Sequence, residues 1–189
     1  MKHKRLGLTV LMVLCILAGG FLAYGYKALF SAHEKAENPS RENELLPKTA
    51  KLRFYLYFVD ENHQFLRAEE RILVQQDSAV ENAKSLINAL IHGPKSGLVP
   101  TLPEEVRLLA LHVTEDAVAY VDFDRAVHEK HPGGILTELF TIFSVVNTLA
   151  LNLEEVDQVK ILIDGNEAKT LTGHIDIRFP FRPNVLMIK

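Results

Sequence analysis

The chain has 189 residues, a formal net charge of −3 and a single cysteine. This length suits one compact domain flanked by shorter segments. The slightly acidic balance argues against a nucleic-acid partner, which would need a basic face. Because Cys15 is the only thiol, the chain cannot form an internal disulfide.

The N-terminal segment predicts a membrane anchor. Residues 1–5 are rich in lysine and arginine, and residues 6–26 contain no charged side chain. An apolar run of about 20 residues can cross a bilayer as a helix, and a basic flank stays in the cytoplasm. We therefore predict a cytoplasmic flank at 1–5 and a transmembrane anchor at 6–30. The rest of the chain then lies outside the cytoplasmic (inner) membrane of a single-pass protein.

Two other processing routes compete with this anchor. Small residues at 17–20 offer a signal-peptidase site, but the apolar run is longer than the roughly 7–15 residues of a signal-peptide core. Lipid attachment at Cys15 is disfavoured because Leu14 precedes it, where lipoprotein signals have a small residue, and because it lies inside the apolar run. We favour the uncleaved anchor.

A polar linker is expected at 31–50, where the residues offer almost nothing to bury. The folded domain should then occupy 51–183, followed by a short C-terminal tail at 184–189. Residues 52–58 alternate apolar and polar side chains, which predicts a strand. A second strand is expected within 65–74, after a turn.

The clearest predicted helix spans 77–92. Ser78 and Glu81 have the spacing of a capping box, in which two side chains satisfy free backbone N–H groups at the helix start. Apolar residues recur at three- and four-residue spacing, and Gly93 with Pro94 ends the pattern.

The second half predicts a hairpin at 106–113 and 117–123, a helix at 135–151, and strands at 159–163 and 175–179. The helix is apolar almost all round, so it should be deeply buried. The element order predicts an α+β fold of two layers, with two helices on one face of a mixed or antiparallel sheet.

Several polar residues invite a search for catalytic or metal chemistry. His128 lies three residues from His131, and Asp122 lies two residues from Asp124. Zinc requires three or four converging ligands, and the sequence contains no HExxH and no Cys/His cluster. We therefore predict no catalytic residue, no metal ligand and no cofactor.

A narrow polar stripe on the second predicted helix is the best candidate for an interaction surface. The same stripe could instead be a close-packed seam within the domain. His174 and Asp176, two residues apart at the start of the last predicted strand, would share a face if the strand included both, and they join the candidate set. The candidate residues are Thr137, Thr141, Ser144, Thr148, His174 and Asp176.

Short motifs along the whole predicted domain together resemble the GerMN domain of the sporulation and spore germination protein GerM. They are FYLYF at 54–58, LIHGP at 90–94, HPGG at 131–134, Glu138, SVVNT at 144–148, VKILIDG at 159–165 and LTGHID at 171–176. The resemblance implies a fold similar to the ring-building motif of bacterial secretion and sporulation machines. It supplies no catalytic residues, and this chain carries one copy where the sporulation protein has two.

Taken together, these features predict a membrane-tethered, non-catalytic binding or scaffold module of the bacterial cell envelope. As partners we expect an envelope protein or a cell-wall polymer, the membrane through the N-terminal helix, and further copies of this chain as an option. The alternatives are a cell-wall-directed hydrolase and a small-ligand-binding domain, which would require converging catalytic groups and a real pocket respectively.

Overall fold

The computed structural model describes residues 50–189. The predicted flank at 1–5 and anchor at 6–30, with the linker up to residue 49, lie outside the described residues. Among the residues that the structure describes, no helix is both long and apolar enough to span a membrane.

The described elements follow one another in the order expected from the sequence, with additions. In chain order they are β1 (Lys51–Val59), β2 (Leu66–Val74), α2 (Ala79–Ile91), β3 (Leu108–Val113), β4 (Val118–Phe123), α3 (Ala126–Glu129), α4 (Ile135–Ala150), β5 (Gln158–Ile163) and the 3-10 helix η1 (Val185–Met187).

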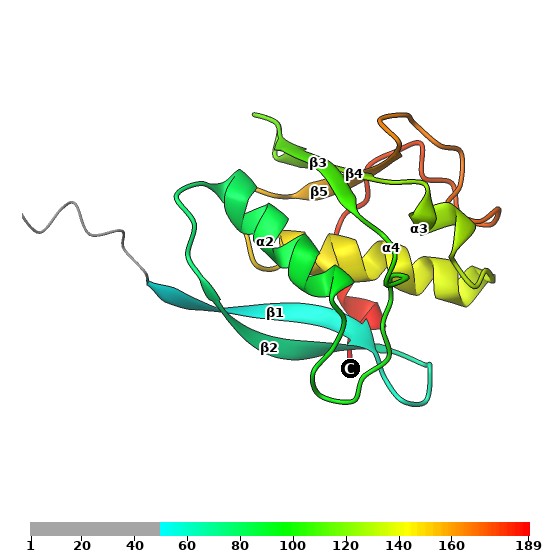
Figure 1. The fold of residues 1–189 in the computed structure, drawn as a ribbon, viewed down its shortest axis with the longest axis horizontal. Helices are drawn as coiled ribbons and strands as arrows, with labels where there is room; N and C mark the ends of the chain where they lie inside the picture. The colour runs from blue at the N-terminus through cyan, green and yellow to red at the C-terminus, as the bar shows by residue number, and fades with distance from the viewer. Residues whose placement is uncertain (1–49) are drawn as a thin grey trace, which may run out of the picture. The chain divides into compact units, whose positions relative to one another are not determined.

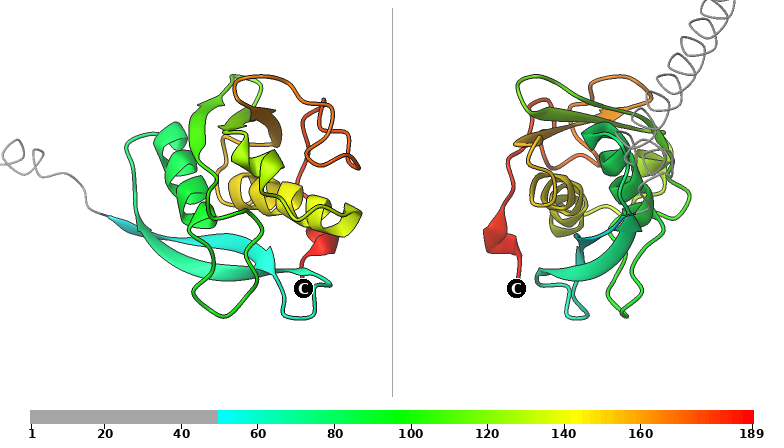
Figure 2. Two further views of the ribbon diagram at one scale, coloured as in Figure 1. Left: turned by 45° about the vertical axis from the view of Figure 1, so that its right-hand side comes forward. Right: turned by 90° about the vertical axis from the view of Figure 1, so that its left-hand side faces the viewer.

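The strands are divided between two sheets, with helices α2 and α4 between them (Figures 1 and 2). Strands β1 and β2 form an antiparallel hairpin. In the other sheet, β4 pairs antiparallel with β3 and parallel with β5. Both helices contact β1, and on the opposite side α2 contacts β3 while α4 contacts β5. The α+β class is confirmed, as is a mixed sheet with two helices on one face; the hairpin adds a third layer.

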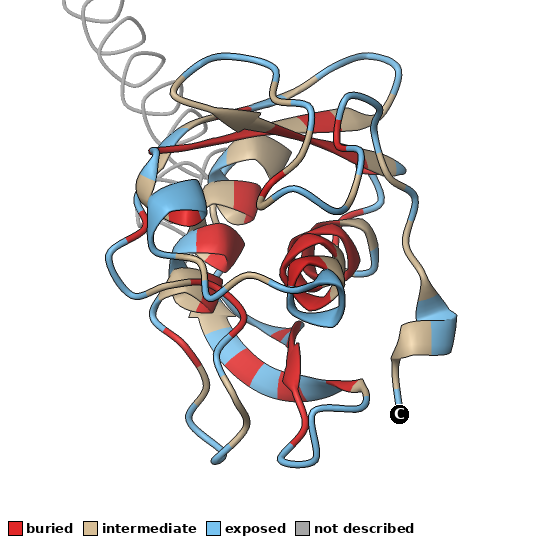
Figure 3. Ribbon diagram, turned by 90° about the vertical axis from the view of Figure 1, so that its right-hand side faces the viewer, coloured by how far each residue is buried: buried red, intermediate tan, exposed pale blue. Residues whose placement is uncertain are grey.

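This third layer explains why α4 is apolar on all sides. A main core joins the hairpin, both helices and the larger sheet, and a smaller cluster places Phe140 of α4 against Tyr57, Val59 and Leu66 of the hairpin. Figure 3, which looks along α4, shows buried residues around most of its circumference. A helix covered on both sides has little room for a solvated face.

Local signals fixed the limits of α2 as predicted. The Ser78 hydroxyl accepts a hydrogen bond from the backbone N–H of Glu81 at 3.2 Å. At the other end, Gly93 takes a φ of +81°, in the left-handed region that a glycine adopts without steric cost.

The predicted strand at 175–179 is wrong. This segment makes only isolated bridges, Thr170 with Asp176 and, further on, Val159 with Phe181. Within 175–179, the N–H of Ile177 donates to the Lys169 carbonyl and the N–H of Arg178 donates to the side chain of Asp176, so the segment forms no regular ladder with a neighbouring strand.

The last residues pack back onto the hairpin. Ile188 forms a parallel bridge with Leu66 of β2, and the N–H of Lys189 donates to the Leu66 carbonyl at 3.0 Å. Asn184 and Asn147 exchange two hydrogen bonds that fasten the segment before η1 to α4.

Candidate functional site

The polar stripe of α4 lies mostly inside the domain. Thr141, Ser144 and Thr148 are buried, and only Thr137, in the first turn of α4, is exposed. The three buried residues therefore do not form a surface, because the hairpin and its neighbouring loops cover this side of α4. The arrangement corresponds to the alternative of a close-packed seam.

Each buried hydroxyl of the stripe has a backbone partner. Thr141 donates to the Thr101 carbonyl at 2.6 Å, and Ser144 donates to the Thr141 carbonyl at 2.9 Å. Thr148 accepts a hydrogen bond from the N–H of Tyr57 on β1 at 3.2 Å. Small hydroxyl side chains allow α4 to approach β1 closely while satisfying backbone groups that would otherwise be buried without partners.

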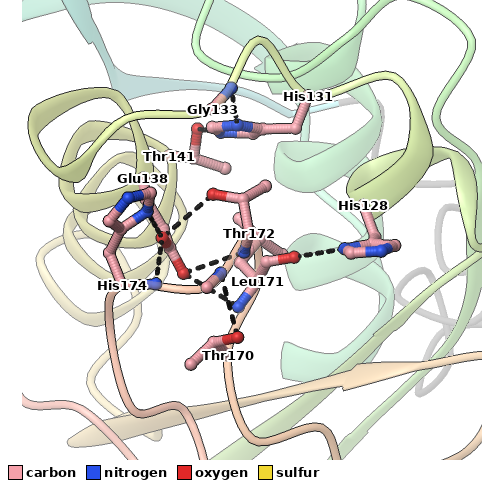
Figure 4. A network of polar contacts seen from close by, with 10 residues as sticks. His128, His131, Gly133, Glu138, Thr141, Thr170, Leu171, Thr172 and His174 are labelled. Atoms are coloured by element: carbon pink, nitrogen blue, oxygen red, sulfur yellow. Dashed lines mark hydrogen bonds and ion pairs between the residues drawn. The ribbon is translucent and has the colours of Figure 1, made fainter.

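The densest polar contact of the domain is centred on Glu138, in the first turn of α4 (Figure 4). Its carboxylate is fully buried and accepts five hydrogen bonds from the loop after β5. The N–H groups of Leu171 and Thr172 donate to Oε1 at 2.9 Å each. The Thr172 hydroxyl, the His174 N–H and the His174 Nδ1 approach Oε2 at 2.9, 3.0 and 3.0 Å. We call Glu138, Leu171, Thr172 and His174 the Glu138 cluster.

These contacts keep Glu138 ionised. Burial alone would raise the pKa of its carboxyl, but hydrogen bonds from Thr172 and the following residues lower the pKa from 4.5 to about 2. The positive end of the α4 dipole also favours an anion in the first turn. The ionised carboxylate therefore has a structural role: it holds the loop at 170–174 against α4.

His131 forms a separate set of hydrogen bonds, which joins the turn before α4 to Thr141 and the loop before β3. Its Nδ1 accepts from the Gly133 N–H at 3.0 Å, so the proton resides on Nε2, which donates to Thr141 at 2.9 Å. Thr141 in turn donates to Thr101. Burial lowers the pKa of His131, which agrees with the neutral ring that this bonding pattern requires.

The other candidate side chains are separately engaged. His128 donates from Nδ1 to the Leu171 carbonyl at 2.6 Å, so it secures the same loop (Figure 4). His174 lies against Glu138, but Asp176 faces away to Arg178, at 2.6 Å from Nη2. Hydrogen bonds from Arg178 lower the pKa of Asp176 to about 2. His174 and Asp176 therefore have different partners and do not share one face.

The remaining carboxylates also hold loops. Asp122 accepts from the Gly165 N–H at 2.8 Å, Asp124 forms an ion pair with Arg107 at 2.9 Å, and Asp164 forms one with Arg125 at 2.9 Å. Within residues 50–189, no three His, Cys, Asp or Glu side chains are placed to hold a metal ion.

The chemistry available to this network is limited. Both oxygens of Glu138 and both ring nitrogens of His131 are occupied, so neither residue can take a proton from a substrate without breaking internal bonds. Sequence reasoning did not assign Glu138 a role, although it is the only charged residue within α4. A single charged residue in an otherwise apolar helix was the sequence feature that could have indicated a buried, hydrogen-bonded carboxylate.

Two open hollows lie elsewhere on the domain. One, of about 480 Å³, borders the β1–β2 turn and includes Asp60, Arg67 and Lys189. The other, of about 580 Å³, lies between the end of α2 and the segment entering β3, next to His92 and Arg107. Both are lined by charged as well as apolar side chains, unlike the enclosed, mostly apolar pockets that hold small molecules.

The geometry defines a small α+β domain in which the motif residues of the sequence make internal contacts: Glu138 bonds to the LTGHID loop, and the HPGG turn bonds to α4 through His131 and Thr141. A family model described as "Germane: Sporulation and spore germination" matches residues 55–169. The chain belongs to this family, which confirms the resemblance to GerMN domains.

Solved structures support the same fold. The chain is 25% identical to a protein from Clostridium perfringens described as a lipoprotein, with a TM-score of 0.52 over 70% of this chain and 88% of that one. It is similar to the tandem GerMN domains of GerM from Bacillus subtilis, with 21% identity, a TM-score of 0.52 and coverage of 69% and 46%. The first GerMN domain alone gives 22%, 0.51, and coverage of 70% and 96%. No curated protein sequence matches the chain.

Proposed function

We propose that this protein is a non-catalytic binding and scaffold module, tethered to the outer face of the bacterial cytoplasmic membrane. The observation that carries the proposal is the saturation of the polar network. The groups that could perform acid–base chemistry, Glu138 and His131 above all, already bond to the protein's own backbone and hydroxyls. Polar groups bonded in this way hold the loops of the domain in one conformation, and a binding surface requires such a rigid support.

The location rests on two supports. The sequence places a basic flank before an apolar run at 6–26, which favours a single-pass anchor with the domain outside. The similar Clostridium perfringens protein is described as a lipoprotein, which is also a membrane-attached protein. A polar linker at 31–50 would then hold the domain near the bilayer, within reach of another envelope protein or the cell wall.

The partner can be sought with photo-crosslinking residues introduced singly into the full chain in intact cells. Suitable positions are exposed and lie in different parts of the fold: Leu109 on β3, Ile135 on α4 and Phe179 in the segment after β5. We expect a discrete adduct from one position and none from the others, because a specific interface covers one face. Equal labelling from all three would contradict a specific scaffold role.

The competing hydrolase function predicts a different result. Purified full chain incubated with peptidoglycan should release no fragments, because the acid–base groups of the candidate site, Glu138 and His131, are held by internal hydrogen bonds. Turnover that disappears in His174→Ala or Asp176→Ala would overturn the proposal. An Arg182→Ala variant, altered at another exposed polar side chain, serves as the control.

A further inference from the structure

The outer edges of the strands differ in how they are covered. On β1, the edge facing away from β2 is occupied: Asn152 bonds to both the N–H and the carbonyl of Tyr55, and Val99 exchanges two hydrogen bonds with Val59. On β5, Val159 exchanges two hydrogen bonds with Phe181. These edges cannot accept another strand without losing internal contacts.

The outer edge of β2 is open. Because Tyr55 and Tyr57 of β1 direct their backbone groups away from β2, the alternation of an antiparallel ladder directs those of Ala68, Glu70 and Ile72 away from β1. Within the described part of the chain, nothing bonds to these three backbone positions. The edge ends at Leu66, where Lys189 donates to the carbonyl.

Two features that often protect an open strand, a bulge and a proline, are missing from this edge, although four of the nine residues of β2 are charged. The β1–β2 register runs without a bulge across all nine residues, whereas β3 has a register shift between Leu108 and Ala110. There is no proline in β2, and Ile72 on the strand is 64% exposed. A long, regular edge with an exposed apolar side chain is a template for another strand.

The charges along β2 point to a second copy of the same chain as that strand. We propose that two copies pair antiparallel through β2, with Ile72 facing Ile72 at the two-fold axis. In this register Arg67 of one copy is level with Asp77 of the other, twice by symmetry; Asp77 lies three residues beyond the end of β2, just before α2. Glu70 already forms an ion pair with Arg53 of its own copy; it lies opposite Val74, whose neighbour on β1 is Lys51, so a further cation of the second copy lies two strands away.

Neighbouring registers are disfavoured by the same charges. Moving the axis to Glu70 places two carboxylates opposite each other, and moving it to Arg71 places two guanidinium groups together. Like charges directly opposite in a sheet are destabilising. On the inner face, Glu69 and Arg71 already form a buried ion pair within each copy, so the exposed Arg67 and Asp77 remain to select the register.

The pairing can be tested by disulfide trapping in the full chain, purified in mild detergent. Cys15→Ser removes the only native thiol, and Ile72→Cys then places a single thiol on the proposed axis. Directly opposite residues in such a pair have Cα atoms about 5.5 Å apart, within the range that a disulfide spans. Ile135→Cys is the matched control, because Ile135 is another isoleucine and is 59% exposed.

Oxidation should convert the Ile72→Cys protein to a covalent dimer and leave the Ile135→Cys protein largely monomeric. Adding Asp77→Lys should lower the rate of trapping about tenfold, since it brings like charges close to each other at both ends of the pair. Adding Arg67→Glu to that variant should restore the rate, while melting curves show that all variants remain folded. Equal trapping at both cysteines, or no recovery in the charge-swapped variant, would overturn the proposal.

Discussion

Replacing Glu138 by glutamine tests whether the Glu138 cluster is the main fastening between α4 and the loop at 170–174. Glutamine keeps the shape of the side chain but has one oxygen instead of two. Since both carboxylate oxygens accept hydrogen bonds, an NH₂ group must face either the Leu171 and Thr172 N–H groups or the Thr172 and His174 donors. One set of donors then loses its acceptor inside the protein.

The size of the effect can be worked from the pKa of Glu138. The pKa of Glu138 falls from 4.5 in the unfolded chain to about 2 in the folded protein. This shift corresponds to about 3 kcal/mol of folding free energy at neutral pH, because a shift of one pKa unit is worth ~1.4 kcal/mol. This agrees with the roughly 3–5 kcal/mol expected when one partner of a buried charged contact is removed. The melting temperature should fall by roughly 10 °C.

The stabilisation by Glu138 depends on pH, and the direction of this dependence follows from its lowered pKa. A folded-state pKa below the unfolded value means that the stabilisation is fully present above about pH 5 and is lost as the pH falls towards 2. The difference in unfolding free energy between the native protein and Glu138→Gln should therefore shrink by about 2 kcal/mol between pH 7 and pH 3. Urea denaturation followed by circular dichroism at several pH values measures it.

The control is Glu129→Gln, the same chemical change at an exposed position on α3, which should alter stability by less than about 0.5 kcal/mol. A Glu138→Gln protein as stable as the native one at pH 7 would refute the reasoning. So would a penalty of the same size at pH 3 and pH 7, because it would come from packing rather than from charge.

Three further predictions concern packing and placement. Phe140→Ala should cost about 3–5 kcal/mol in denaturant unfolding, and more than Phe143→Ala, because Phe140 is 3% exposed and Phe143 only half-buried. Asn152→Ala should cost about 0.5–1.5 kcal/mol by removing its hydrogen bonds to the exposed Tyr55 backbone groups, and unchanged stability would contradict the closed edge of β1. Protease added to spheroplasts should degrade the domain and leave a short anchored fragment, whereas full protection would reverse the predicted orientation.

Local sequence signals predicted the elements of this domain well. The cap at Ser78 and the glycine at 93 are short-range features, so α2 and its end could be predicted without knowledge of the fold. The failed strand at 175–179 shows the limit. Its apolar and polar residues alternate, but the N–H of Arg178 bonds to the Asp176 side chain. His174, just before the segment, bonds to the distant Glu138, a contact that no window of local sequence contains.

The candidate site was predictable only in part. The motifs around 131–138 and 171–176 were recognised as a set, but their mutual contact depends on packing between residues more than 30 positions apart. His174 and Asp176 were grouped by their spacing on an assumed strand. Because no strand forms there, the two side chains take separate partners, Glu138 and Arg178.

The composition of α4 contained the information that a second sheet was needed. A helix packed on one sheet keeps a polar face towards water, yet in α4 the residues outside the apolar majority are chiefly Thr141, Ser144, Asn147 and Thr148. Such short side chains satisfy backbone groups at close range and do not project into solvent. Thr148 bonds to the edge of β1 and Asn147 bonds to the segment before η1, so the polar stripe marks where the hairpin and the chain end cover the helix. Helix α4 thus closes one edge of the hairpin, which leaves β2 as the edge through which this sheet can extend.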